Sequence, residues 1–159
     1  KSEVQRLLTL LKMETSIYNL EARIGKDGKP YIMELSPRGG GNRLAEIVKM
    51  ATGIDLISLS VKAAVGDKVE NYKELRYNGY WGEIILHSDF EGYFNEIKID
   101  PKIEQYVVEL DLWVKKGDLI KPFTGANETI GTIVIKCDNQ LQLNEIIDNF
   151  KEWIKVTVS

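Results

Sequence analysis

Two glutamates near the start of the sequence are spaced so that a pair of antiparallel strands would bring them face to face. Glu21 and Glu34 lie in the stretches 17–24 and 31–36, where polar and apolar residues alternate as they do in β-strands. The Asp-Gly pair at positions 27 and 28 is a strong signal for a two-residue hairpin turn. That turn sets the register of the strands, and in this register Glu21 is opposite Glu34.

A divalent cation is the ligand that such a pair would hold. Two carboxylates directly opposite each other on a hairpin repel and lower its stability. Magnesium and similar hard cations bind carboxylate oxygens together with the phosphates of a substrate. We therefore predict that Glu21 and Glu34 are metal ligands. The alternative is that Lys26, Lys29 or Arg38 neutralises an exposed pair of glutamates that binds nothing.

The residues after the second stretch add a signal for anion binding. Segment 36–43 reads Ser-Pro-Arg-Gly-Gly-Gly-Asn-Arg, and its glycines allow the backbone to approach a ligand closely. We expect Asn42 to cap a helix that starts near residue 43. The N-terminus of such a helix offers free N–H groups and the positive end of its dipole to an anion. With Arg38 alongside, the pattern predicts a site for a metal and a phosphorylated or carboxylate ligand.

The order of these features resembles the C-terminal half of an ATP-grasp domain. The features are a strand with a glutamate, a hairpin, Glu-x-Ser-Pro-Arg, a glycine run, a helix and the sequence Ala-Thr-Gly-Ile-Asp-Leu at 51–56. The family includes carboxylate–amine ligases, biotin carboxylase and carbamoyl-phosphate synthetase. The resemblance covers roughly residues 1–70 well, and the remainder resembles the small C-terminal domain of the amino-acid-ligase branch more loosely.

The resemblance implies a role for each residue of this motif. Glu21 and Glu34 would hold magnesium or manganese on the phosphates of ATP. Arg38 would be the catalytic residue, contacting the acyl substrate or the transferring phosphate. The family commonly has asparagine where this chain has Ser36, whose hydroxyl is still able to ligate. The cofactor-binding residues would be Ser36, Gly39, Gly40 and Gly41.

The function implied by the resemblance is that of an ADP-forming ligase. Such an enzyme converts a small carboxylate to an acyl phosphate with ATP, and an amine or other nucleophile then displaces phosphate. One alternative is an enzyme like carbamoyl-phosphate synthetase or biotin carboxylase that acts on bicarbonate. Another is a non-catalytic nucleotide-binding module, which Ser36 favours and the intact Glu21, Glu34 and Arg38 oppose. Because the sequence starts at Lys1 and enters the hairpin after a single helix, we expect an N-terminal half of the same protein, without which this fragment is inactive.

Composition narrows the class of protein further. The chain has 159 residues and a net charge of −3, which argues against a general nucleic-acid binder. No apolar run approaches the roughly 20 residues that a membrane helix needs. Cys137 is the single cysteine, so no internal disulfide forms, and a reducing cytoplasm is the expected location. We interpret Cys137 as buried and the lone His87 as structural; whether the protein is a homo-oligomer stays open.

We predict an α+β fold with two domains. Residues 1–72 would be the C-terminal half of an ATP-grasp domain, with a helix at 3–13, the hairpin, and two helices covering one face of the sheet. Residues 73–159 would be a small antiparallel β domain of four or five strands with a C-terminal helix that begins at residue 139 or 140.

Overall fold

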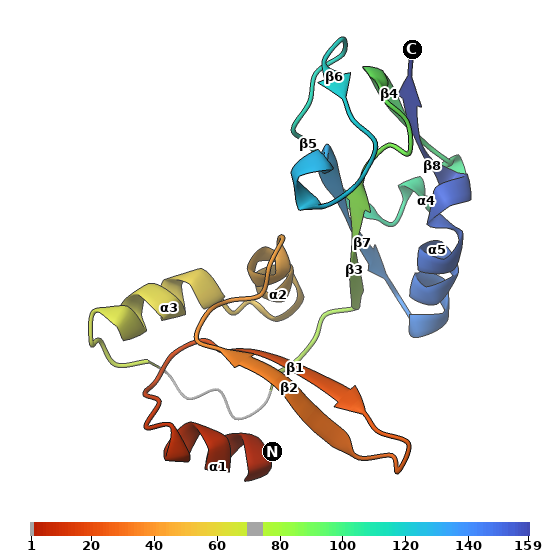
Figure 1. Ribbon diagram of the computed structural model, residues 1–159. Coiled ribbons are helices and arrows are strands. Elements are labelled where there is room, and N and C mark those ends of the chain that lie inside the picture. The colour runs from red at the N-terminus through yellow and green to blue at the C-terminus, as the bar shows by residue number, and fades with distance from the viewer. Residues whose placement is uncertain (1, 70–74) are drawn as a thin grey trace. The chain divides into compact units, whose positions relative to one another are not determined.

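The computed structural model describes residues 2–69 and 75–159 (Figure 1). The chain divides into two compact units, Lys1–Arg76 and Tyr77–Ser159. The domain boundary predicted between residues 72 and 73 lies outside the described residues. Helices and antiparallel sheets are mixed along the chain, so the predicted α+β class is confirmed. Within the described ranges, no helix has both the length and the apolar character that crossing a membrane requires.

Two helix termini of the first unit lie at residues that favour such positions. Gly53, with φ of 78°, ends its helix in the left-handed conformation. The side chain of Asp55 accepts a hydrogen bond from the N–H of Ser58 and so caps the next helix. The ammonium of Lys49, 2.7 Å away, and this N–H hold the pKa of Asp55 below its usual value. The elements of the unit are α1 (Ser2–Leu10), β1 (Asn19–Ile24), β2 (Pro30–Ser36), α2 (Leu44–Thr52) and α3 (Leu56–Ala64).

Strands β1 and β2 pair in the register that the sequence predicts for the candidate site. Glu21 is the partner of Glu34, and Asn19 is the partner of Ser36. This pairing is confirmed even though the turn that was expected to set it differs from the prediction.

The turn of the hairpin is longer than the predicted two residues. Ile24 pairs with Pro30, so the loop consists of residues 25–29. The Asp27 side chain accepts the backbone N–H two residues later, at 3.1 Å, a local hydrogen bond that competes with a tight turn. A loop with an odd number of residues shifts the register by one position, but a β-bulge at Met33 adds one residue to β2 and restores it.

The helices of the first unit leave much of the hairpin uncovered, contrary to our expectation. Among the described hydrophobic residues of this unit, the buried ones are Ile47 and Ala51, both on α2, and none lies on the hairpin. An isolated two-stranded sheet is marginally stable in water. The exposed apolar side chains of the hairpin are Leu20, Ile24, Tyr31 and Met33.

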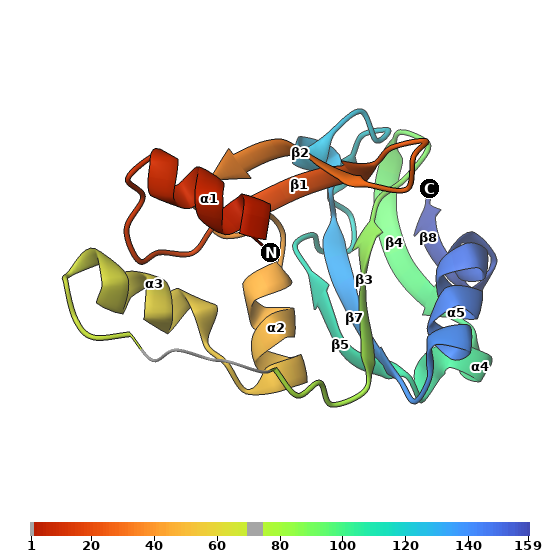
Figure 2. The same ribbon diagram turned by 90° about the horizontal axis from the view of Figure 1, so that it is seen from below.

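The second unit consists of two three-stranded antiparallel sheets, of strand order β3-β7-β5 and β6-β4-β8. Both views show α5 running beside β3 (Figures 1 and 2). The elements are β3 (Tyr80–Leu86), β4 (Gly92–Ile99), α4 (Pro101–Glu104), β5 (Val107–Leu112), β6 (Leu119–Ile120), the 3-10 helix η1 (Ala126–Glu128), β7 (Gly131–Cys137), α5 (Gln140–Trp153) and β8 (Ile154–Val158).

Two short elements of this unit were not predicted from the sequence. The described residues of the unit form six strands rather than four or five, because the two residues of β6 are too few for an alternating pattern. The one-turn helix α4 was also missed. Its signal was present, since Asp100 caps the helix through the N–H of Lys102 and Pro101 occupies the first helical position.

Side chains from both sheets and from α5 form one core in the second unit. Ile133 on β7 is fully buried, and Phe94 on β4 and Ile146 on α5 belong to the same cluster. Cys137 is buried in this core, as predicted. Burial raises the pKa of the Cys137 thiol, and the charge of Asp138 adds to the effect. The thiol therefore stays protonated and weakly nucleophilic at neutral pH.

Replacing Ile133 by alanine should lower the free energy of unfolding of the second unit by about 2–5 kcal/mol, because the packed core would retain a cavity. Leu141 on α5 is 80% exposed and provides the matched control. Leu141→Ala should change stability by no more than about 0.5 kcal/mol. Chemical denaturation followed by circular dichroism measures both variants, and equal losses would contradict the assignment of this core.

Candidate functional site

Four oxygen-bearing side chains lie together on the β1–β2 hairpin. Residues two apart in a strand share a face, and directly opposite residues have neighbouring Cβ atoms. The two cross-strand pairs therefore place one amide, one hydroxyl and two carboxylates on the same face of the hairpin. These side chains are Asn19 and Glu21 from β1, and Glu34 and Ser36 from β2. Asn19 belongs to the segment 17–24, in which polar and apolar residues alternate, but no role was predicted for it.

The two carboxylates differ in how far their charge is balanced. Glu34 accepts a hydrogen bond from the Ser36 hydroxyl at 2.5 Å, and the guanidinium of Arg38 is 4.0 Å from the same oxygen. Glu21 has no hydrogen bond or ion pair with any residue that the structure describes. Lys29 is paired with Asp27 at 3.8 Å instead. A neighbouring cation therefore compensates the charge of Glu34 but not that of Glu21.

Arg38 is held at the end of β2 by its own backbone. Its N–H donates to the carbonyl of Ser36 at 2.9 Å, a three-residue turn centred on Pro37. The fixed φ of proline suits this turn. One guanidinium nitrogen donates to the carbonyl of Gly39 at 3.0 Å, and the side chain is 58% exposed. Because more than half of this side chain is exposed, the guanidinium is accessible to a ligand.

The glycine run offers backbone donors next to this arginine. The N–H groups of Gly39, Gly40 and Gly41 donate to no protein acceptor in the described part of the chain. A Cβ atom at Gly39 or Gly41 would meet nothing within 4 Å, so the backbone there is open to approach. At Gly40 a Cβ atom would collide with the side chain of Leu44, which packs against the loop.

The predicted N-cap of the helix after the glycines is wrong. Arg43, not Asn42, is the N-cap of α2, and no side chain caps its N–H groups by a hydrogen bond. Asn42 instead has a φ of 52°, a left-handed conformation that asparagine tolerates better than most residues. Arg43 forms an ion pair with Glu46 in the first turn. The N–H of Leu44 donates to the carbonyl of Gly41 at 3.4 Å, so the N–H groups that follow it in the first turn are the ones left for an anion.

The donor set on the hairpin fits a magnesium or manganese ion that also has ligands from outside the chain. The described residues hold no group of three or more His, Cys, Asp and Glu side chains that would complete a metal site. Two carboxylates, a hydroxyl and an amide leave coordination positions for phosphate oxygens and water. This division of ligands is typical of magnesium at phosphate sites. Zinc would need the nitrogen or sulfur ligands that the hairpin lacks.

Comparison with solved structures defines the fold. The chain superposes on an L-amino acid ligase from Bacillus licheniformis with a TM-score of 0.78 and 23% identity, over 99% of this chain and 40% of that one. A phosphoribosylglycinamide synthetase from Anaerococcus prevotii gives a TM-score of 0.75 and 24% identity, over 100% of this chain and 41% of that one. The biotin carboxylase domain of Hydrogenobacter thermophilus 2-oxoglutarate carboxylase was solved with MgADP, ADP and bicarbonate. It gives a TM-score of 0.69 and 16% identity, over 99% of this chain and 35% of that one.

These structures are ATP-grasp ligases, and the chain has the fold of the C-terminal part of an ATP-grasp protein, as the sequence motif predicted. At sequence identities below 25% the likeness establishes the fold. The chain spans about two fifths of the first two structures.

Sequence comparison adds one relative. No family model matches the sequence. The uncharacterized protein y4rH of Sinorhizobium fredii is 27% identical over 157 residues, which is 98% of this chain and 32% of that protein. The chain therefore spans about a third of the length of this relative.

Replacing Glu21 by glutamine, with divalent ions removed, should leave the free energy of unfolding unchanged or raise it by up to about 1 kcal/mol, because a like-charge repulsion is lost. The contrasting substitution is Glu46→Gln, which removes the same charge from an ion pair with Arg43. That variant should lose about 0.2–1 kcal/mol. Chemical denaturation compares the two, and a clear loss in Glu21→Gln would mean that Glu21 has a structural partner.

Proposed function

We propose that the complete protein is an ATP-dependent, ADP-forming ligase that activates a small carboxylate for attack by an amine or another nucleophile. The observation that carries the proposal is the facing pair Glu21 and Glu34. This pair stands beside Arg38 and an open glycine loop, on a fold shared with ATP-grasp ligases. The identity of the carboxylate and of the nucleophile is not specified by these residues.

Each side chain of the hairpin has a defined task in this proposal. Glu21 and Glu34 hold magnesium, which neutralises charge on the phosphates of ATP. Asn19 supplies the amide oxygen that ATP-grasp proteins commonly place at the position of Ser36. The Ser36 hydroxyl fixes one oxygen of Glu34 by its hydrogen bond, so that the other oxygen is free to coordinate.

The proposed reaction has two displacement steps. An oxygen of the carboxylate attacks the γ-phosphorus of ATP, the bond to the ADP oxygen breaks, and an acyl phosphate forms. The nitrogen of the amine then attacks the acyl carbon, the bond between that carbon and the bridging oxygen breaks, and phosphate leaves with this oxygen. The nitrogen loses a proton to solvent. Arg38 and the N–H groups of Gly39 and Gly41 would stabilise negative charge on the transferring phosphoryl group and on the departing phosphate.

A second part of the same protein is proposed to cover the hairpin. Tyr31 and Met33 are 53% and 60% exposed, and neither α2 nor α3 buries them. An apolar surface next to a nucleotide site suits a partner that completes both the sheet and the nucleotide pocket. ATP would then lie between that part and the hairpin, where it is shielded from water.

The test of the proposal measures ADP release by the complete protein with magnesium and ATP. Carboxylates and amines are supplied singly and together, and bicarbonate is a separate arm. We expect release that needs a carboxylate and is lost in Glu34→Gln. ADP release with bicarbonate alone would favour the bicarbonate-using class. Failure of the protein to bind any nucleotide would refute the proposal.

Arg38→Ala in the complete protein should lower kcat by about 10²–10³-fold and leave ATP affinity nearly unchanged. The reason is its position past the end of β2, where Arg38 would stabilise the negative charge that develops while the phosphoryl group is transferred. Arg38→Lys should recover part of the activity, because lysine has the charge but lacks the planar fork. Steady-state kinetics with a separate measurement of nucleotide affinity tests this. A proportionate loss of ATP binding with kcat intact would make Arg38 a nucleotide-binding residue.

The 159-residue chain by itself should show no ATPase or ligase activity. Positioning of reactants contributes about 7–11 kcal/mol to barrier reduction, and this chain would supply half of the contacts to ATP. A sensitive assay of ADP release by the purified chain is the measurement. Turnover that disappears in the Glu34→Ala variant of the same chain would contradict this expectation.

A further inference from the structure

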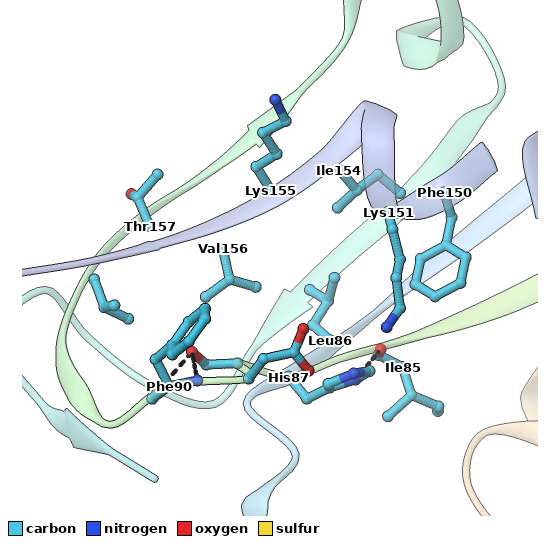
Figure 3. Close-up of a pocket in the computed structure, with 13 residues that line it drawn as sticks. Ile85, Leu86, His87, Phe90, Phe150, Lys151, Ile154, Lys155, Val156 and Thr157 are labelled. Carbon is cyan, nitrogen blue, oxygen red and sulfur yellow. Dashed lines mark hydrogen bonds between the residues drawn. The ribbon is translucent and has the colours of Figure 1, made fainter. Parts of the chain in front are cut away.

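A cavity of about 330 Å³ lies within the second unit (Figure 3). It is formed by residues 85–90, at and after the end of β3, and by residues 150–158, at the junction of α5 and β8. This volume is at the lower end of the range for small-molecule sites. All of its lining residues belong to one compact unit, so the cavity is a feature of that unit alone.

One wall of the cavity is a turn with a fixed conformation. The hydroxyl of Ser88 donates to the carbonyl of Phe90 at 2.8 Å and accepts the N–H of the same residue at 3.1 Å. Ser88 is 5% exposed, so these bonds are protected from water. The turn that carries Asp89 and Phe90 is therefore formed before any ligand arrives, which limits the entropy lost on binding.

Cationic and hydrogen-bonding groups meet at one end of the cavity. Figure 3 shows the amine of Lys151 directed toward the ring of His87, whereas the amine of Lys155 points away from that ring. The Nδ1 atom of His87 lies 3.2 Å from the carbonyl of Ile85. Because a carbonyl only accepts, Nδ1 carries the proton and donates. The other ring nitrogen, Nε2, is then a hydrogen-bond acceptor and adds no donor to the cavity. The ring of Phe123 packs against the imidazole at 4.5 Å and holds its orientation.

Lys151 has no hydrogen bond or ion pair with another residue in the described ranges. An anion beside it would gain a charge-assisted hydrogen bond at no cost in broken protein contacts. The remaining walls are mainly apolar, with Phe90, Phe150 and Val156 among them. Asp89 also lines the cavity, and its carboxylate would repel a second negative charge on a ligand.

We propose that this cavity binds a small monocarboxylate with an apolar body. The carboxylate would accept a hydrogen bond from Lys151, and the apolar part would cover Phe90, which is 73% exposed. Asp89 selects against dicarboxylates. This site is separate from the one proposed for ATP on the hairpin, and it needs neither ATP nor magnesium.

Isothermal titration of the complete protein with 4-methylpentanoate, without nucleotide or magnesium, tests the proposal. We expect one site with a dissociation constant on the order of 1 mM or below, as befits a ligand of this size. Glutarate should bind at least about tenfold more weakly because of Asp89, and 3-methylbutylamine should not bind because it lacks the carboxylate.

Three variants locate the binding. Lys151→Met keeps an apolar stem and should weaken binding by about tenfold or more, since a hydrogen bond to a charged group is lost. Lys155→Met is the matched control, with an expected change within about twofold, because an outward charge is screened by solvent. Arg38→Ala should bind as the unaltered protein does, which separates this cavity from the proposed carboxylate site beside the hairpin. Absence of binding, equal binding of the amine, or loss of binding in Arg38→Ala but not in Lys151→Met would overturn the proposal.

Discussion

Two carboxylates held opposite each other on a two-stranded sheet need a compensating charge, and the surroundings of Glu21 and Glu34 supply only part of it. The Ser36 hydroxyl and the more distant Arg38 balance Glu34, whereas Glu21 has no partner among the described residues. A folded protein that keeps such an arrangement carries an electrostatic cost in the absence of a ligand. The glycine loop and the arginine beside this pair suit a ligand that brings a cation and its own anionic groups together.

The two units of the chain bury their hydrophobic residues to very different degrees. The second unit has a continuous core to which two sheets and α5 contribute, centred on the fully buried Ile133. The first unit buries Ile47 and Ala51 on α2 and exposes the apolar side chains of its hairpin. Hydrophobic burial is the main stabilising term in folding, so the first unit draws less stability from its own core than the second does. The candidate site thus lies on the unit that buries fewer of its hydrophobic residues.

The hairpin shows how a correct register arose from a turn that the sequence predicted wrongly. Asp27 and Gly28 indicated a two-residue turn, and counting from it paired Glu21 with Glu34. The structure has a five-residue loop, and the bulge at Met33 cancels the difference before the site is reached. A bulge has no reliable sequence signature, because it depends on how neighbouring side chains pack rather than on an alternating pattern. The agreement at Glu21 and Glu34 therefore rests on two deviations that offset each other.

The sequence by itself determined the class of fold, the order of the long helices and strands, and the grouping of Glu21, Glu34 and Arg38. Periodicity and turn residues carry that information locally. The tertiary structure alone decided the left-handed conformation of Asn42 and the cavity that brings His87 and Lys151 together. Those two residues are far apart in the chain, and no local pattern records that the end of β3 meets the junction of α5 and β8. Such proximity follows from how the sheets and α5 share one core, which is a property of packing rather than of any segment.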